Sequence, residues 1–409
     1  MQFADDSGFI IKRLLSSFDK CRQPTPTKKL RKVMDKFYAE FVEGEKYYRT
    51  QIPELKARVH SNANIVHASM IGHYFLPDHV RKIIQENISY QLEYRVTILE
   101  RDITIRIALF NKNDLMKMEK YAEYVSFICV WLHICIRNAS ITTCKELSIY
   151  LYPTKIKKRL PQRKTDNIGV NNANSAFTTR CPRNSGEIII YREEEWKRVF
   201  IHETFHTFCF DINPHTEREI HSGLSSLFAI PTIFSASEAY ADTWARIMNA
   251  AYASFTSTKR NGEGVEEFAI YLNFSLQIER MFSLLQMKKI LGFQDINYDS
   301  LFVAKHSTNG DSKSNGVYRE DSMTNVFGYY ILSGILMNGY EEFIIWCQAH
   351  NFNLFKFTKV PAKSDNAFVK LIEKCSKKEQ CKIMDVFGAG KRRRFMNTTT
   401  RMSVIELSG

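Results

Sequence analysis

The residues best suited to chemistry are two histidines four positions apart, His202 and His206, with Glu203 between them. On an α-helix, residues four apart lie one turn apart on the same face, so both imidazoles can direct a nitrogen at one cation. Glu203 is rotated by about 100° from His202, which places its carboxylate beside a bound metal rather than on it. The pattern predicts a metal site in which Glu203 is the general base toward a metal-activated water.

The same string also fits an ordinary buried helix whose two histidines are satisfied by hydrogen bonds. HExxH is short enough to arise by chance, so its surroundings must decide between the two interpretations. A β-branched run at 186–192 leads directly into a predicted helix over 193–210, and apolar residues stand on both sides of its histidines. A helix of this kind is buried, and buried imidazoles need partners.

A metal site requires a third protein ligand. The spacing with glycine three and histidine six residues after the second histidine is absent, because a cysteine and an isoleucine stand there. A later predicted helix supplies Glu238 as ligand and, one turn on, Asp242 as acceptor of the outer N–H of a metal-bound histidine. Glu238 also fits a capping box with Ser235, and this structural role remains open. Weaker candidates lie in a polar connector: His215, Glu217, Glu219 and His221.

HETFH at 202–206 followed by EAYAD at 238–242 resembles the gluzincin metallopeptidases, the thermolysin-like group with the pattern HExxH then ExxxD. The resemblance covers roughly residues 85–350. It implies a zinc-dependent endo- or exopeptidase that holds one Zn2+ per chain on the two histidines and Glu238. It also implies a peptide or protein substrate, bound in a cleft between two subdomains.

Gluzincins usually add a tyrosine or histidine that stabilises the tetrahedral oxyanion. The stretch TNVFGYYILSG at 324–334 resembles the tyrosine helix of oligopeptidase-type members, which implies Tyr329 or Tyr330 in this role. Packing of both rings as core aromatics is the alternative. The stretch ANSAF at 173–177 is expected to form an edge strand that pairs with an extended substrate.

VFIHETFH together with TNVFGYY also resembles uncharacterised metallopeptidase-like proteins of large DNA viruses, which implies association with a virion. A second class of function follows from this: a catalytically silent structural or virion-associated protein that retains a peptidase-like fold. The intact Glu203 argues against it, because a protein without catalysis has no chemical need for that carboxylate.

The elements expected around these residues indicate an α+β fold. Residues 89–110 alternate as a two-stranded hairpin, and 113–136 form a continuously apolar helix that Asn113 could cap. Further strands are expected at 147–152, 175–179 and 186–192. Together with these elements, the resemblance to gluzincins implies a zincin-like fold. Such a fold has a small mixed β-sheet subdomain with a backing helix and the HExxH helix, followed by a mostly helical lower subdomain.

Four regions are expected along the chain. An N-terminal helical region over 1–84 precedes the zincin-like upper subdomain over 85–212. The helical lower subdomain over 213–386 carries the third metal ligand, and a basic flexible tail occupies 387–409.

Composition bounds the remaining possibilities. The 409 residues carry a net charge of +13 and nine cysteines with no CxxC pair. No signal peptide is evident, so reduced thiols and a cytoplasmic location are expected. No uncharged apolar stretch is long enough to cross a bilayer. The basic runs 155–164 and 390–395 offer a third interpretation, contact with a polyanion, against the alternative of solvated loop and tail.

Overall fold

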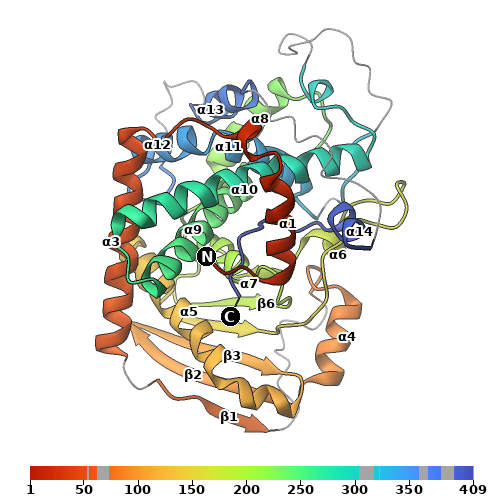
Figure 1. The fold of residues 1–409 in the computed structure, drawn as a ribbon. Helices are drawn as coiled ribbons and strands as arrows, with labels where there is room; N and C mark the ends of the chain where they lie inside the picture. The colour runs from red at the N-terminus through yellow and green to blue at the C-terminus, as the bar shows by residue number, and fades with distance from the viewer. Residues whose placement is uncertain are drawn as a thin grey trace. The chain divides into compact units, whose positions relative to one another are not determined.

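The computed structural model describes residues 1–52, 55–61, 73–303, 317–321, 323–358, 367–378 and 391–408. The chain forms two compact units, shown with their helices and strands in Figure 1. Residues 35–157 and 174–210 make up the sheet unit. Residues 1–34, 158–173 and 211–408 make up the helical unit.

This division differs from the expected four regions. The N-terminal region over 1–84 is not separate, because its first 34 residues belong to the helical unit and the rest to the sheet unit. Helix α3 (Lys28–Gln51) contains the point of division. The expected boundary after residue 212 lies two residues beyond the one observed after 210.

The sheet unit contains one open, mixed sheet of six strands in the order β1-β2-β3-β4-β6-β5. Strands β3, β4 and β6 run parallel to one another, and the other pairs are antiparallel. Their bounds are β1 Arg58–Ser61, β2 Tyr90–Ile98, β3 Arg101–Leu109, β4 Glu146–Leu151, β5 Ala176–Thr178 and β6 Ser185–Ile190. The described chain is thus mixed α and β, as the sequence predicts.

The expected hairpin is present as β2 and β3, with full antiparallel register from Tyr90↔Leu109 to Ile98↔Arg101. Its turn consists of Leu99 and Glu100, which have φ angles of 46° and 64°. Positive φ at both central residues matches the right-handed twist of the strands, although neither residue is a glycine or asparagine. The turn therefore lies near the middle of the predicted 89–110 hairpin.

Helices cover both faces of this sheet. Helix α4 (Asp78–Asn87) packs on one face, in a buried cluster that includes Val80, Ile84, Tyr150 and Ile189. Because side chains alternate along a strand, the neighbours Ile188 and Ile190 lie on the other face, where they are equally buried. Helices α5 (Met118–Asn138) and α7 (Trp196–Thr207) pack there against β2 and β6.

The start of the backing helix differs from the prediction. Asn111, not Asn113, provides the cap, since its side chain accepts a hydrogen bond from the Asp114 N–H at 3.1 Å. A short 3-10 segment, η2 (Lys112–Lys117), then precedes α5. Buried Trp131 of α5 donates its indole N–H to the Thr204 hydroxyl of α7 at 2.9 Å, which fixes the two helices together.

The helical unit is built around α9 (Ala236–Arg260) and α10 (Val265–Phe293), most of whose side chains are buried. A π-helical turn, η5 (Phe327–Leu332), packs against both and continues into α11 (Ser333–Asn338). The remaining elements of this unit are α1 Asp5–Leu15, α2 Phe18–Cys21, α6 Val170–Ala173, α8 Pro214–Leu227, η3 Asp299–Leu301, α12 Tyr340–His350, α13 Ala367–Ser376 and α14 Lys391–Thr398.

The C-terminal segment after α14 is part of the helical core, in contrast to the flexible tail expected over 387–409. Buried Glu279 of α10 accepts hydrogen bonds from the N–H groups of Val404 and Ile405 at 2.9 and 2.8 Å. It also accepts the Ser403 hydroxyl at 2.5 Å. Burial raises the pKa of Glu279, although these hydrogen bonds act in the opposite direction. Residues 387–390 of the predicted tail lie outside the described residues.

Among the described helices, none combines the length and the apolar character that crossing a membrane requires.

Candidate metal site

Helix α7 carries the HExxH residues and is held firmly by the sheet unit. It follows β6 after a short link, and every residue except Lys197 is buried. Its last residue, Thr207, shares a hydrogen bond of 2.7 Å with the Thr178 hydroxyl of β5. The Thr207 hydroxyl also donates to the backbone carbonyl of Glu203 at 3.0 Å. The sheet therefore fixes the position of this helix, as the strand-to-helix pattern predicts.

The three glutamates just before this helix each lie beside a basic side chain. Glu193 pairs with Lys120 and Lys155. Burial pushes the pKa of Glu193 up, and the hydrogen bonds from the two lysines outweigh it, so this pKa is lowered. Glu195 adopts a left-handed conformation at φ 58° and lies 3.5 Å from Arg198.

The two histidines meet within the sheet unit. Their Nε2 atoms are 3.1 Å apart, and the rings stand edge to face with an interplanar angle of 76°. Both side chains are buried. Two ligands of one tetrahedral zinc ion, with bonds of about 2.0–2.1 Å, are separated by about 3.3 Å. The pair fits such an ion, and the same separation also fits a single N–H···N hydrogen bond between the rings.

Glu203 is buried in the same helix, with 8% of its surface exposed. Its charge acts on Tyr191, which follows β6. Burial is the main reason that the pKa of Tyr191 is raised, with Arg192 opposing and Glu203 adding to the increase. The carboxylate of Glu203 therefore lies in a poorly solvated environment, where a proton acceptor interacts strongly with nearby charge.

Glu238 lies in the first turn of α9, and the capping box considered for it does not form. The Ser235 hydroxyl donates to the Glu217 carboxylate at 3.0 Å instead of accepting from the helix. The same Glu217 oxygen accepts the Ser237 N–H at 3.1 Å, and Asp211 accepts the Ser237 hydroxyl at 2.9 Å. Acidic side chains from outside α9 thus accept the hydrogen bonds of its N-terminal serines. This role was not predicted from the sequence.

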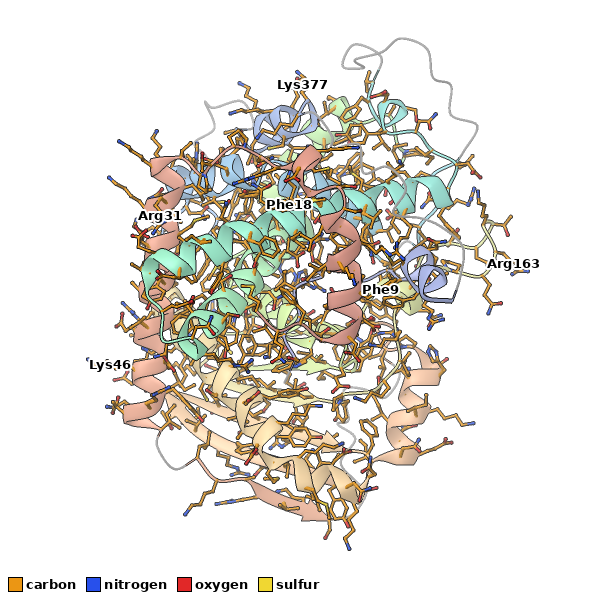
Figure 2. All side chains as sticks on the ribbon, viewed as in Figure 1. Phe9, Phe18, Arg31, Lys46, Arg163 and Lys377 are labelled. Atoms are coloured by element: carbon orange, nitrogen blue, oxygen red, sulfur yellow. A yellow bond between two sulfur atoms is a disulfide. The ribbon has the colours of Figure 1, made fainter. Side chains whose placement is uncertain are left out.

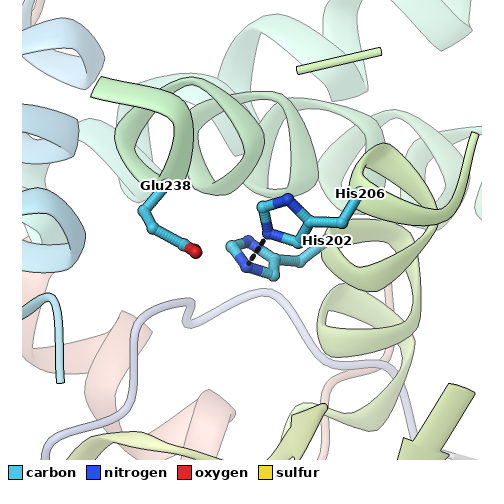
Figure 3. Close-up of side chains that lie close together, drawn as sticks. All are labelled: His202, His206 and Glu238. Atoms are coloured by element: carbon cyan, nitrogen blue, oxygen red, sulfur yellow. Dashed lines mark hydrogen bonds between the residues drawn. The ribbon is translucent and has the colours of Figure 1, made fainter. Parts of the chain in front are cut away.

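Figure 3 draws the three side chains of the candidate ligand set, His202, His206 and Glu238. The histidines belong to the sheet unit and Glu238 to the helical unit.

Asp242 has a partner within the helical unit that the sequence analysis did not identify. Its Oδ2 atom lies 2.7 Å from Nε of Arg246, one turn later on α9, and both side chains are almost fully buried. An acid and a base four residues apart on a helix are a recognisable pattern, so this ion pair could have been predicted from the sequence. The predicted contact of Asp242 with a histidine stays a prediction.

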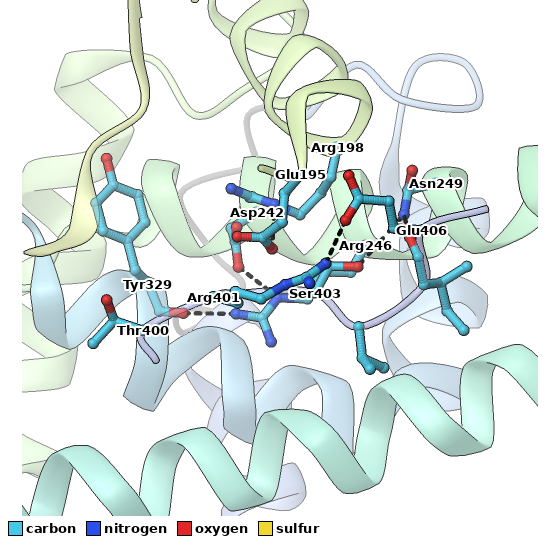
Figure 4. Close-up of polar contacts among 12 residues, drawn as sticks. Glu195, Arg198, Asp242, Arg246, Asn249, Tyr329, Thr400, Arg401, Ser403 and Glu406 are labelled. Atoms are coloured by element: carbon cyan, nitrogen blue, oxygen red, sulfur yellow. Dashed lines mark hydrogen bonds and ion pairs between the residues drawn. The ribbon is translucent and has the colours of Figure 1, made fainter. Parts of the chain in front are cut away.

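The two candidate tyrosines have different environments. Tyr330 is buried, and its hydroxyl donates to the Thr400 carbonyl at 2.6 Å. A hydroxyl that already donates to a backbone carbonyl is a poor oxyanion donor, so the interpretation of Tyr330 as a packed core aromatic fits. Tyr329 is half-buried, and Figure 4 shows its ring directed away from the buried contacts of Arg246. Tyr329 is therefore the better of the two candidates.

The weaker ligand candidates have contacts of their own within the helical unit. The Nδ1 atom of His221 accepts the N–H of Phe234 at 3.2 Å. His215 and Glu219 face each other on the surface of α8 at 3.5 Å. Glu217 caps α9, as described above. These side chains stabilise α8 and its neighbour rather than forming a second cluster of ligands.

Cys181 and Cys209 are joined as a disulfide with a Cα separation of 5.1 Å, in contrast to the reduced thiols expected from the sequence. The bond connects the loop before β6 to the residue two positions after α7. Both backbone N–H groups donate to the carbonyl of His206, at 3.0 and 3.3 Å. The disulfide therefore holds the chain on either side of a candidate metal ligand.

We expect Cys181→Ala and Cys209→Ala each to lower the free energy of unfolding by about 3 kcal/mol, because the cross-link closes a 28-residue separation. Urea unfolding measures this loss. The double variant should lose no more than either single variant, since both remove one bond. Cys144→Ala, which removes a free thiol from the same unit, is the control and should add its own effect independently. Additive losses for Cys181 and Cys209 would contradict the cross-link.

Four basic residues of the run at 155–164 form ion pairs with nearby acids. Figure 2 labels Arg163, whose side chain is 81% exposed and projects outward. The ion pairs of the basic run are Lys155–Glu193, Lys157–Glu194, Arg163–Asp166 and Lys164–Asp295. Within 390–395, residue 390 and the side chains of 391–394 lie outside the described residues. Polyanion contact remains a prediction from charge alone.

Comparison with known proteins finds no matching family model, no similar curated protein and no similar solved structure.

Proposed function

We propose that this chain is a zinc-dependent metallopeptidase with a zincin-like fold. The main support is the 3.1 Å separation of the His202 and His206 Nε2 atoms on a buried helix that directly follows a sheet strand. Two neutral imidazoles and a carboxylate are a donor set that zinc prefers in hydrolytic sites. In this proposal Glu238 is the third ligand, and α5 is the helix that backs the sheet.

A bound zinc ion would supply Lewis acidity, which lowers the pKa of a coordinated water to about 7 and polarises a carbonyl. Glu203 takes the proton from the attacking water and delivers it to the leaving amine. Its position one residue after His202 keeps it next to the ligands without being one. The buried setting of α7 strengthens the interaction of this carboxylate with developing charge.

Strand β5 would align the substrate. It is the terminal strand of the described sheet, paired on one side with β6 from Ala176↔Ile190 to Thr178↔Ile188. An extended peptide can add to such an edge through main-chain hydrogen bonds. The Thr178–Thr207 hydrogen bond connects this strand to the end of α7, which would place a bound peptide in register with the histidines.

Tyr329 would donate its hydroxyl to the tetrahedral oxyanion. An oxyanion donor of this kind contributes about 2.7–4 kcal/mol to transition-state stabilisation. Asp242, in the same proposal, accepts the outer N–H of a metal-bound histidine and fixes its tautomer.

Metal analysis and peptide cleavage test the proposal together. The purified chain should contain about one zinc ion, as a site with three protein ligands requires. Cleavage of a quenched-fluorescent peptide library should disappear with 1,10-phenanthroline and return when zinc is added. Cleavage that resists removal of the metal, or a chain that takes up no zinc, would refute the assignment.

A further inference from the structure

Arg246 connects three elements of the helical unit from a buried position on α9. Only 1% of its surface is exposed. Figure 4 shows its guanidinium between Asp242 and the backbone of Tyr329. Its Nη1 atom also donates to the Ser283 hydroxyl of α10 at 2.5 Å. The side chain thus contacts α9, α10 and the π-helical turn at once.

The contact with the π-helical turn is made at the backbone carbonyl of the candidate oxyanion tyrosine. Nη2 of Arg246 donates to the Tyr329 carbonyl at 3.0 Å and to the Ser333 hydroxyl at 3.2 Å. Ser333 donates to the same carbonyl. A π-turn shifts carbonyls out of the regular helical ladder, and such turns occur frequently at functional sites. Arg246 and Ser333 together fix where Tyr329 leaves the backbone.

The same turn lies directly against the first turn of α9. A Cβ atom added to Gly328 would meet the Ser235 carbonyl oxygen at 2.9 Å and Cβ of Glu238 at 3.5 Å. The first distance is shorter than real Cβ contacts allow, so only glycine permits this approach. Tyr329 follows Gly328 in the chain, and the Glu238 backbone is therefore its near neighbour within the unit.

We propose that Arg246 is a positioning residue, which holds the Tyr329 turn in a fixed relation to the Glu238 end of α9. This inference rests on the proposed function, in which Tyr329 and Glu238 act on the same substrate. The guanidinium suits this role because its planar fork donates several hydrogen bonds in fixed directions. The ion pair with Asp242 anchors one side of the fork, which leaves the other side to hold the Tyr329 carbonyl.

A double-mutant cycle tests whether Arg246 acts through Tyr329. Tyr329→Phe should lower kcat by about 100- to 1000-fold with little change in KM. Arg246→Lys keeps the charge beside Asp242 but loses the fork, and should lower kcat by about 10- to 100-fold. In the Tyr329→Phe background, the same Arg246→Lys change should have almost no further effect. Equal losses in both backgrounds, or no loss in the first, would overturn the proposal.

Matched variants separate positioning from loss of stability. Arg280→Lys changes another buried arginine of this unit, which donates to Asn338 and to the Cys21 carbonyl. It should not alter kcat. Tyr330→Phe is the control for Tyr329→Phe, since its hydroxyl is committed to Thr400. If Arg246→Lys does not fold, Ser333→Ala removes one holder of the Tyr329 carbonyl and leaves the ion pair intact.

Amide hydrogen exchange provides a readout that does not depend on activity or on bound metal. Arg246→Lys should speed exchange across residues 327–333, whereas Arg280→Lys should not. If the wild-type chain cleaves no peptide but this difference appears, the proposed function fails and the positioning of the turn stands. Unchanged exchange across 327–333 in Arg246→Lys would overturn the positioning role.

Discussion

Replacing Glu203 with glutamine is expected to abolish peptide cleavage while zinc remains bound. Glutamine has nearly the same shape as glutamate but cannot accept the proton of the attacking water. General base catalysis contributes about 10²- to 10⁴-fold, so kcat/KM should fall by about 1000-fold or more. The ligands are untouched, and zinc content should therefore stay at the wild-type level. Both quantities are measured on the same preparation.

A matched control variant shows whether lost activity reflects general damage to this part of the sheet unit. Glu193→Gln changes another glutamate at the start of α7, which contacts Lys120 and Lys155 rather than the histidines. It should keep most of the cleavage activity. The pKa of Glu193 is lowered in the fold. The ionised Glu193 therefore contributes to the free energy of unfolding above the usual carboxylate pKa, and this contribution is lost as pH falls through the lowered value. Cleavage retained by Glu203→Gln would remove Glu203 from the mechanism.

Replacing one of the three proposed ligands is expected to release the zinc. Loss of an outer partner of a metal ligand already costs about 10- to 100-fold in affinity, so loss of a ligand should cost more than about 100-fold. His202→Ala, His206→Ala and Glu238→Gln are the variants. Competition with a chromogenic zinc chelator measures the affinity of each.

The comparison among these variants distinguishes a shared ion from a histidine pair alone. Glu219→Gln is the control, because Glu219 is exposed on α8 beside His215 and should leave affinity unchanged. If both histidine variants lose zinc but Glu238→Gln binds as tightly as wild type, Glu238 is not the third ligand. If no variant differs from wild type, the two imidazoles form only the hydrogen bond that their 3.1 Å separation also allows.

Features that depend on local spacing could be predicted from the sequence. The alternation of apolar residues over 89–110 predicted the hairpin, which forms as β2 and β3. The β-branched run at 186–192 predicted β6, and the buried helix after it carries His202 and His206 on one face. These signals lie within one helical turn or one strand, where the backbone period alone decides which side chains are neighbours.

Contacts between distant segments could not be predicted in this way. Whether Glu238 is needed for a capping box depended on Glu217, which lies 18 residues before Ser235 in the chain. Whether Tyr330 has an available hydroxyl depended on Thr400, 70 residues later. The burial of the C-terminal segment depended on Glu279 of α10, since a basic and polar composition by itself indicates a solvated tail.

The amino-acid sequence by itself determined which side chains are chemically able to bind a cation, and that His202, Glu203 and His206 share one buried helix. Only the tertiary structure decided which hydroxyls and carboxylates are already engaged, and that Arg246 holds the turn carrying Tyr329. The physical reason is that a helical or strand period is set by adjacent residues. A hydrogen-bond partner, by contrast, is set by packing, which brings together groups that no periodic pattern relates.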